Sequence, residues 1–238
     1  MEIIPAIDII GGKCVRLEKG DYSTSKQYAE DPLEVAKAFE GAGIRRLHLV
    51  DLDGAKAKHV VNLRVIERIV SNTRLVVDFG GGVKTDEDIR KVFEAGAQMV
   101  TGGSIAAKER EIFLGWLEKY GSEKIILGAD VLDDHIMVSG WQESSELPWE
   151  EFLTYYMGKG VKKVISTDIS RDGMLTGPAF DLYDEMLNRF PEIQLIASGG
   201  VSSYEDLVQL KEQGLYGAII GKAYYEGKVS LEQLAGLC

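Results

Sequence analysis

The stretch IQLIASGGVSSYEDLVQLKEQGLYGAIIGKA, residues 193–223, shows the pattern that decides the fold. Two short apolar runs, 193–200 and 217–223, have the length and composition of buried strands. Between them lies an amphipathic segment, 203–214, which begins on serine and ends on glycine, as helix caps prefer. A helical segment that connects two strands in this way predicts a parallel pair.

The same alternation of strand and helix runs along the whole chain of 238 residues. Further amphipathic segments occupy 31–43, 61–72 and 85–97. Eight strand-like runs span residues 2–8, 46–51, 74–80, 98–103, 124–131, 162–168, 193–200 and 217–223. These runs are apolar almost throughout, which indicates burial on both faces. Eight such units in this length predict an α/β fold, a (β/α)8 TIM barrel.

An open, doubly wound sheet is the competing fold, but it usually has a Gly-rich fingerprint after its first strand. Here that strand ends in AIDIIGGK, which lacks the GxGxxG spacing.

An internal repeat supports the barrel, because four landmarks recur about 120 residues later. Asp8 recurs as Asp130, Asp51 as Asp168, Gly81 as Gly199, and Gly102 as Gly221. We therefore predict one domain, residues 1–238, built of two half-barrels over about 1–120 and 121–238.

Composition narrows the possible functions. Hydrophobic residues make up 45% of the chain and charged residues 27%, which is typical of a soluble globular protein. The net charge of −11 argues against nucleic-acid binding, although backbone donors can still bind phosphate. Neither Cys14 nor Cys238 belongs to a CxxC pair, so no disulfide framework or zinc site is predicted. No signal peptide or membrane span is recognisable, and we expect a cytoplasmic protein.

Two aspartates interrupt apolar runs beside glycines, although an ionised carboxylate is costly to surround with apolar groups. Asp8 ends the first predicted strand and Asp130 the fifth. These strands lie opposite each other in an eight-strand ring, and reactive residues of such barrels lie at the carboxyl ends of strands. The two carboxyls could therefore act as an acid and a base on one substrate. The alternative is that each Asp caps a loop or pairs with a nearby Lys or Arg.

Glycine-rich turns follow four of the predicted strands. GGGV and TGGS follow the third and fourth strands, and SGGV and IGKA follow the seventh and eighth. Such turns let the backbone N–H groups approach a phosphate closely. Turns of this kind at matching repeat positions predict two phosphate sites on opposite rims, which suits a ligand with a phosphate at each end. The alternative is that the glycines only form tight turns.

Other residues at strand ends are weaker candidates for substrate contact. Asp51 would point into the mouth of the barrel, while His48 could equally be a core histidine. Arg16 could reach a substrate anion or lie on the surface. Trp141, in a long polar loop after the fifth strand, could stack on a heteroaromatic ring or only pin that loop. Thr167 lies at the end of the sixth strand and Asp172 in the loop that follows it.

No metal site is predicted, because His59 and His135 have no partner at the spacing of metal ligands.

Seven motifs together resemble the phosphoribosylformimino-5-aminoimidazole carboxamide ribotide isomerases of histidine biosynthesis. The motifs are PAIDIIGGKCVRLEKGDY, HLVDLDGAKAKHVVN, FGGGVKTDEDI, LGADV, VSGWQ, TDISRDGMLTGP and ASGGVSS. They follow the family order and span essentially the whole chain. The resemblance implies an Amadori rearrangement of an aminoaldose to an aminoketose, on a substrate with a phosphate at each end. It implies no metal or organic cofactor and no obligatory protein partner.

The resemblance also implies roles for individual residues. Asp8 would be the general base that removes the proton at C2′, and Asp130 the general acid that opens the ribose ring. Thr167 and Asp172 would position the ribose and its acid, and Trp141 would stack on the imidazole. Substrate-contacting positions are matched by Arg16, His48 and Asp51. One phosphate would be held by Gly81, Gly82, Gly102 and Gly103, and the other by Gly177, Gly199, Gly200, Gly221 and Lys222.

This chain departs from the family pattern at the first phosphate site. It has GGGVK where many relatives read GGGIR, and TGGS where they read IGTA. Lys84 therefore replaces an arginine, which changes the geometry of the charge. Gly103 replaces a hydroxyl residue, for which Ser104 could compensate.

Three other readings compete with the isomerase. The cyclase subunit of imidazole glycerol phosphate synthase shares the barrel, the paired Asp and the phosphate sites, but it is a lyase that draws ammonia from a glutaminase; PAIDI and TDISRDGMLTGP favour the isomerase. A bifunctional isomerase that also serves tryptophan synthesis would carry a further arginine where this chain has SGWQESSE. A non-catalytic phosphosugar-binding barrel would leave the opposed Asp pair idle.

Overall fold

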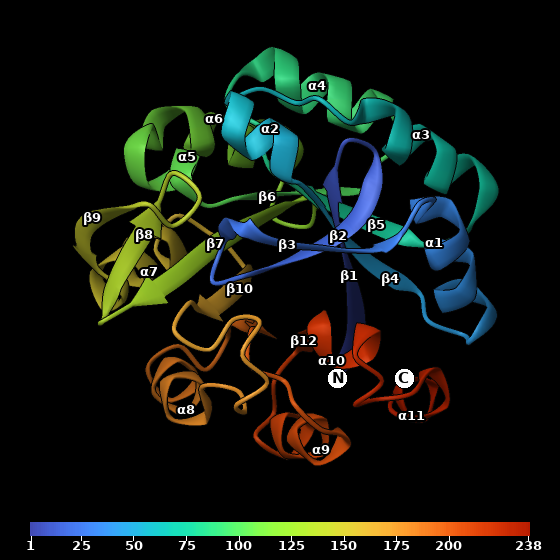
Figure 1. The fold of residues 1–238 in the computed structure, drawn as a ribbon. Coiled ribbons are helices and arrows are strands. Elements are labelled where there is room, and N and C mark those ends of the chain that lie inside the picture. The colour runs from blue at the N-terminus through green and yellow to red at the C-terminus, as the bar shows by residue number, and fades with distance from the viewer.

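The computed structural model describes residues 1–238 and contains eight parallel strands in a closed ring (Figure 1). In order around the ring they are β1 (Glu2–Ile10), β4 (Arg46–Asp51), β5 (Val76–Gly80), β6 (Met99–Gly102), β7 (Ile125–Leu132), β10 (Lys163–Asp168), β11 (Gln194–Ser198) and β12 (Gly217–Ile220). β12 pairs with β1, with Ile3 opposite Ala218, and this pairing closes the ring. The eight predicted strands are all present, and the predicted (β/α)8 TIM barrel is confirmed.

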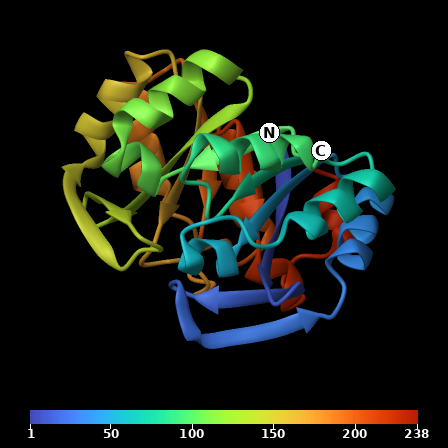
Figure 2. The ribbon, with the colours of Figure 1, turned by 90° about the horizontal axis from the view of Figure 1, so that it is seen from above.

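Helices connect successive strands and cover the outside of the ring (Figures 1 and 2). The longer ones are α1 (Pro32–Gly41), α3 (Leu63–Asn72), α4 (Asp86–Glu94), α6 (Arg110–Tyr120), α7 (Trp149–Met157), α8 (Phe180–Arg189) and α9 (Tyr204–Glu212). The shorter ones are α2 (Leu52–Ala57), α5 (Ser104–Lys108), α10 (Lys222–Tyr225) and α11 (Leu231–Ala235). None of these helices has the length and apolar character that crossing a membrane requires.

Two helices at matching places in the repeat begin with the same capping device. Thr85 caps α4 and Ser203 caps α9, and each side chain accepts a hydrogen bond from the backbone three residues later. In turn, the carboxylates of Asp88 and Asp206 accept a hydrogen bond from the backbone N–H of the cap residue, which completes a capping box. The same local chemistry therefore starts the helix after β5 and the helix after β11.

The inside of the ring is filled by its own small apolar cluster. Side chains alternate between the two faces of a strand, so one set points inward and the other toward the helices. The inner cluster consists of Ile4, Ala6, Met99, Ile126, Ile165, Ile196 and Ile219. A separate cluster of 53 buried residues, which includes Phe39, Trp116 and Tyr183, packs the strands against the helices.

The inward positions change character two residues further along the strands. Above Ala6 comes Asp8, above Ile165 comes Thr167, and above Ile219 comes Gly221. Because the side-chain period of a strand is two, these residues face the same interior as the inner cluster. The barrel is therefore packed below and lined by polar or very small residues at its mouth, the space at the carboxyl ends of the strands.

Two β-hairpins that the sequence analysis did not predict stand at the mouth. β2 (Lys13–Glu18) and β3 (Asp21–Ala29) follow β1, and β8 (His135–Val138) and β9 (Glu143–Pro148) follow β7. The first hairpin continues β1 by antiparallel pairing, with Asp8 opposite Val15, and projects from the barrel in Figure 2. Many β3 side chains are polar and exposed, so strand pairing rather than apolar alternation holds them, and periodicity did not reveal these strands.

We expect the inner cluster to dominate the stability of the ring. Ile126→Ala removes a fully buried side chain from it and should lower the free energy of unfolding by about 2–5 kcal/mol. Ile112→Ala in α6 is the matched control: that side chain is 37% exposed, so its loss should cost about 0.5 kcal/mol or less. Urea unfolding followed by circular dichroism measures both, and equal losses would contradict the assignment.

Candidate active site

Asp8 and Asp130 both lie at the mouth, at the carboxyl ends of β1 and β7. Burial raises the pKa of both carboxyls above the ordinary value. The charge of His48 opposes the rise at each of them, so this side chain lies within reach of both carboxyls from below. The structure thus brings the two predicted acids to one mouth.

Asp8 also has a direct cationic partner that Asp130 lacks. Arg16, on β2, places Nη1 2.9 Å from Oδ2 of Asp8, and both side chains are largely buried. Asp8 therefore does form the ion pair with a nearby cation that the sequence left open as an alternative. This ion pair lies within the mouth of the barrel. Asp130 is instead faced by the neutral side chains of Trp141 and Thr167, which only partly offset the effect of burial on its pKa. The two carboxyls therefore differ in how strongly their surroundings favour ionisation.

Asp172 adds a third carboxyl to the same mouth. Burial raises its pKa to about 6; the charges of Asp8 and Asp130 push it the same way, while Arg16 and Lys222 oppose it. Its backbone carbonyl accepts a hydrogen bond of 3.2 Å from the N–H of Lys19, which ties the β10 loop to the first hairpin. The mouth thus contains three interacting acids, although the sequence motif suggested only a positioning role for this one.

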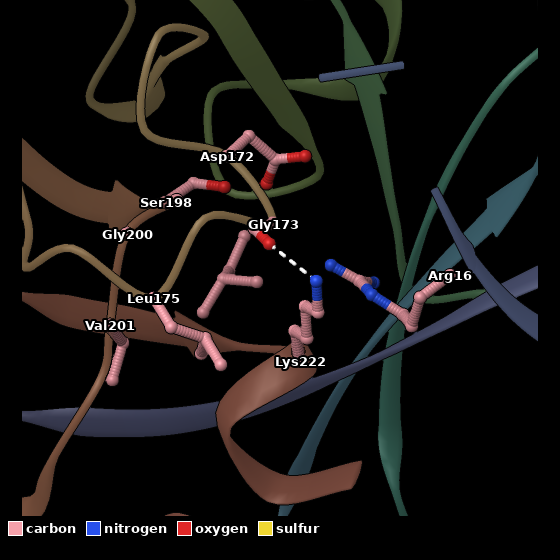
Figure 3. Close-up of a pocket in the computed structure, with 11 residues that line it drawn as sticks. Arg16, Asp172, Gly173, Leu175, Ser198, Gly200, Val201 and Lys222 are labelled. Carbon is pink, nitrogen blue, oxygen red and sulfur yellow. Dashed lines mark hydrogen bonds between the residues drawn. The ribbon is translucent and has the colours of Figure 1, made fainter. Parts of the chain in front are cut away.

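A pocket opens beside the ends of β11 and β12, at the predicted second phosphate site (Figure 3). It is lined by Arg16, Gly199, Gly200, Gly221 and Lys222 among others. A Cβ at Gly221 would overlap the guanidinium of Arg16, so this glycine makes room for the cation. Four of the five residues predicted for this site line one pocket, together with a cation that was predicted only as a weaker contact.

Lys222 and Gly177 lie differently within that region. The Lys222 ammonium donates to the carbonyl of Gly173 at 2.8 Å (Figure 3) and to Glu18 at the end of β2, and these two groups hold it at the pocket. Gly177 stands behind the lining: its N–H donates to the carbonyl of Gly200 at 2.9 Å. A Cβ at Gly200 would overlap the carbonyl of Gly177, so the two glycines pack backbone to backbone. Gly177 therefore supports the pocket from behind.

Glycines of the predicted first phosphate site have close neighbours within the protein. A Cβ at Gly81 would overlap the carbonyl of Asp51, and one at Gly82 would lie 2.6 Å from the carbonyl of His59. A Cβ at Gly102 would lie 2.9 Å from the ring of Phe113. Tight packing within the protein is therefore enough to require glycine at these three positions, whether or not a phosphate binds there. Gly103 differs, because its Cβ position lies 3.9 Å from a carboxylate oxygen of Asp130 and so faces the mouth.

Positive charge gathers on the same rim around Lys84, in part from two lysines that the sequence motifs missed. Burial, together with the charges of Lys108 and Lys58, lowers the pKa of Lys84. Lys58 at the end of α2 and Lys108 on α5 are therefore near enough to repel the charge of Lys84, although Lys108 also pairs with Glu143; a bound anion would relieve this repulsion. Lys108 also donates to Ser139 at 2.8 Å, beside Trp141 in the β8–β9 hairpin. Nothing in the sequence marks Lys58 or Lys108 as a neighbour of Lys84, because only the closed ring brings them close to it.

Asp51 does not point into the mouth as predicted. Its carboxylate is fully buried and accepts hydrogen bonds from the backbone N–H groups of Gly54, Val61 and Asn62 at 2.7–2.9 Å, and from the Asn62 amide. All of these donors lie in the segment between β4 and α3. In this structure the carboxylate has no free oxygen for a ligand, and its role is to shape the loop.

The remaining predicted residues lie around the two acids. Thr167 is buried on β10 directly opposite Asp130 in the strand register. His48 is held inside the barrel by a hydrogen bond from its ring to Asp78. Trp141 has a left-handed backbone, and a Cβ at Gly20 would lie 2.8 Å from its indole ring. The hairpins after β1 and β7 therefore meet across the mouth.

Comparison with known proteins yields one family and many close relatives. The family described as "Histidine biosynthesis protein" matches residues 2–230. A protein of Bacteroides thetaiotaomicron named 1-(5-phosphoribosyl)-5-((5-phosphoribosylamino)methylideneamino) imidazole-4-carboxamide isomerase is 61% identical over 98% of both chains. Proteins with the same name from Flavobacterium johnsoniae and Cytophaga hutchinsonii are 57% and 52% identical, again over 98% or more of this chain.

The raised pKa of Asp172 predicts a pH-dependent cost to the fold. A carboxyl with a higher pKa in the folded than in the unfolded state loses stability as the pH rises between the two values, here from 3.8 to about 6. Asp172→Asn should therefore gain stability over wild type across that window and hold the gain above it. Because some solvent reaches the side chain, we expect about 1–2 kcal/mol at neutral pH.

Urea unfolding of both proteins at about pH 4 and about pH 7.5 measures this difference. Asp133→Asn, an exposed acid on the neighbouring β7–β8 turn, is the control and should gain nothing at either pH. An equal gain for Asp172→Asn at both pH values would show that titration is not its cause.

Proposed function

The chain belongs to the histidine biosynthesis protein family, and we propose that it is the isomerase that the names of its relatives describe. It converts an aminoaldose, the phosphoribosylformimino derivative of 5-aminoimidazole-4-carboxamide ribonucleotide, to the corresponding aminoketose by an Amadori rearrangement. One observation carries the proposal most directly: two opposed carboxyls share a mouth whose two rims both carry cations and glycine turns. This arrangement suits a ligand with a phosphate at each end and its reacting ribose in the middle.

The reaction requires an acid and a base at neighbouring atoms of the ribose. Protonation of the ring oxygen breaks its bond to C1′, while the nitrogen lone pair forms the C1′=N bond. Removal of the proton at C2′ then gives an enaminol, which becomes the ketone as its hydroxyl loses a proton and C1′ gains one. No electrons leave the substrate, so side-chain acids and bases suffice for the chemistry, and the proposal includes no metal or organic cofactor.

The surroundings of the two acids support the division of roles. Arg16 and His48 both favour the ionised form of Asp8, which suits the general base at C2′. Asp130 faces one distant cation and two neutral donors, so burial favours its protonated form, which suits the general acid. Pairs of carboxyls whose environments differ in this way separate acid from base.

The rest of the mouth binds and orients the substrate. Arg16, Gly221 and Lys222 hold one phosphate, supported by Gly199 and Gly200. Gly103 and the three lysines Lys58, Lys84 and Lys108 hold the other. Trp141 covers the imidazole, while Thr167 and Asp172 position the ribose. Acid, base and both anion sites come from one chain, so no obligatory protein partner is included, and the two free cysteines suit action in the reducing cytoplasm.

The proposal is tested by a direct assay of purified protein with the bis-phosphorylated aminoaldose. Wild type should form the aminoketose without added metal, and should be inactive on the cyclase substrate supplied with ammonia. Asp8→Asn and Asp130→Asn should each lower kcat about 10²–10⁴-fold, the contribution of a positioned acid or base. Asp133→Asn, exposed three residues beyond Asp130, is the control and should keep wild-type turnover.

The same assay separates Asp130 from Asp172 as the proton donor. If Asp172 only positions groups, Asp172→Asn should retain markedly more activity than Asp130→Asn. The reverse order would transfer the role of acid to Asp172, and near-normal turnover of Asp8→Asn would overturn the role of the base.

Lys84 should act in binding and not in chemistry. Removing a charged donor from a phosphate costs about 1.5–3 kcal/mol, so Lys84→Gln should raise KM about tenfold or more with little change in kcat. Lys91→Gln in α4 is the matched control, because that lysine is exposed and pairs with Glu87 away from the mouth. Steady-state kinetics of both variants checks this, and an unchanged KM for Lys84→Gln would remove it from the site.

A further inference from the structure

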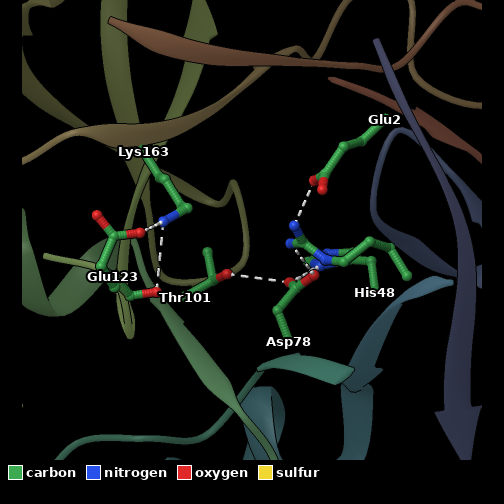
Figure 4. A network of polar contacts seen from close by, with 7 residues as sticks. Glu2, His48, Asp78, Thr101, Glu123 and Lys163 are labelled. Carbon is green, nitrogen blue, oxygen red and sulfur yellow. Dashed lines mark hydrogen bonds and ion pairs between the residues drawn. The ribbon is translucent and has the colours of Figure 1, made fainter. Parts of the chain in front are cut away.

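A polar network lies inside the barrel, beneath the mouth, where the other inward positions are mostly isoleucine (Figure 4). At its centre is Asp78 of β5, whose side chain is almost completely buried. Its Oδ1 lies 2.5 Å from Nδ1 of His48 and accepts a hydrogen bond of 3.3 Å from the hydroxyl of Thr101. Its Oδ2 lies 3.5 Å from Nη2 of Arg46, which in turn pairs with Glu2.

Packing alone does not account for this network. A buried carboxylate loses its hydration and needs cationic or hydrogen-bonding partners to compensate. Replacing a buried ion pair by apolar groups of similar volume is often neutral or stabilising. The same interior holds Ile126, Ile165 and Ile196, which fill space at no such cost. The need to fill the ring therefore does not explain the presence of Asp78 on β5.

The network reaches the mouth through a single side chain, His48. On one side its ring is fixed by Asp78; on the other, its charge acts on Asp8 and Asp130. The charged groups that act on it are Asp8 from β1, Arg16 from β2, Asp78 from β5 and Asp130 from β7, while Arg46, from its own strand β4, acts on Asp78. Acidic groups on three strands therefore face the ring. Two cations partly offset them. Arg16 is paired with Asp8 above the ring and opposes the rise in the pKa of His48. Arg46 lies near Asp78 below the ring.

We propose that Asp78 is a positioning residue for the isomerisation: by binding Nδ1 it holds His48 in the imidazolium form, a fixed positive charge beneath Asp8 and Asp130. Burial by itself lowers the pKa of His48, but Asp78 and then Asp8 outweigh it and raise that pKa. The resulting charge lowers the pKa of both mouth carboxyls against their burial. The charge on His48 thereby keeps Asp8 ionised and available as a base at neutral pH. This inference rests on the proposed function.

The first measurement follows the imidazole and needs no turnover. NMR of the full chain labelled at histidine resolves three rings, His48, His59 and His135, and His48→Gln assigns the first. In wild type, His48 should titrate above the ordinary value of about 6.5. In Asp78→Asn, where burial remains and the anion is gone, it should titrate at least about one pH unit lower than in wild type.

Thr101→Val is the matched control for that measurement. It removes one neutral hydrogen bond to Asp78 but keeps the carboxylate, so the titration of His48 should move far less than in Asp78→Asn. A wild-type His48 that titrates below about 6.5 would overturn the proposal. This holds even if Asp78→Asn fails to fold, because the wild-type titration alone decides the point.

The second measurement follows catalysis. In Asp78→Asn the lower limb of the kcat/KM profile against pH, where the base loses its proton, should move up by about one unit. In a His48→Gln background, the same substitution should move that limb no further. A fall by one common factor at every pH would indicate packing only and overturn the proposal. Failure of wild type to isomerise the substrate would instead count against the proposed function, and the NMR titration would stand.

Discussion

The inward-facing positions of eight strands are the constraint on which the rest of the structure depends. A closed ring has no second layer to fill its interior, so its own strands must supply every inward side chain. Ile165 fills the ring, and Thr167, two residues later on the same strand, faces the mouth. The core and the site at the mouth are thus formed by successive inward positions of the same strands. The hydrogen-bonded ring therefore holds the acids of the mouth in fixed positions.

The electrostatics of the mouth follow from that geometry. Three carboxyls converge because several strands end there, and burial raises the pKa of each. Arg16 from a hairpin and His48 from below supply the positive charge that makes the acids unequal. We expect this crowding to lower the stability of the barrel, which is the usual relation between a functional site and the fold that carries it.

Strand periodicity and the internal repeat were enough to predict the barrel, because eight apolar runs alternate with capped helices. They also predicted the placement of Asp8 and Asp130, since strand ends meet at one rim. The hairpins were missed because exposed antiparallel strands such as β3 carry no apolar alternation. Asp51 was misread because a strand-end position does not reveal that the following loop will surround its carboxylate with donors. Lys58 and Lys108 meet Lys84 only in three dimensions, and the interior role of Asp78 depends on partners from neighbouring strands.

The seam between β1 and β12 has a consequence for how the chain reaches its fold. The first strand finds its second neighbour only among residues 217–220, at the far end of the sequence, and the two termini lie together in both ribbon views. During synthesis, β1 and β11 would each present an unpaired edge until the last strand leaves the ribosome. Such edges invite pairing with other chains, so β12, which is translated long after β1, is the strand that protects the nascent protein from aggregation.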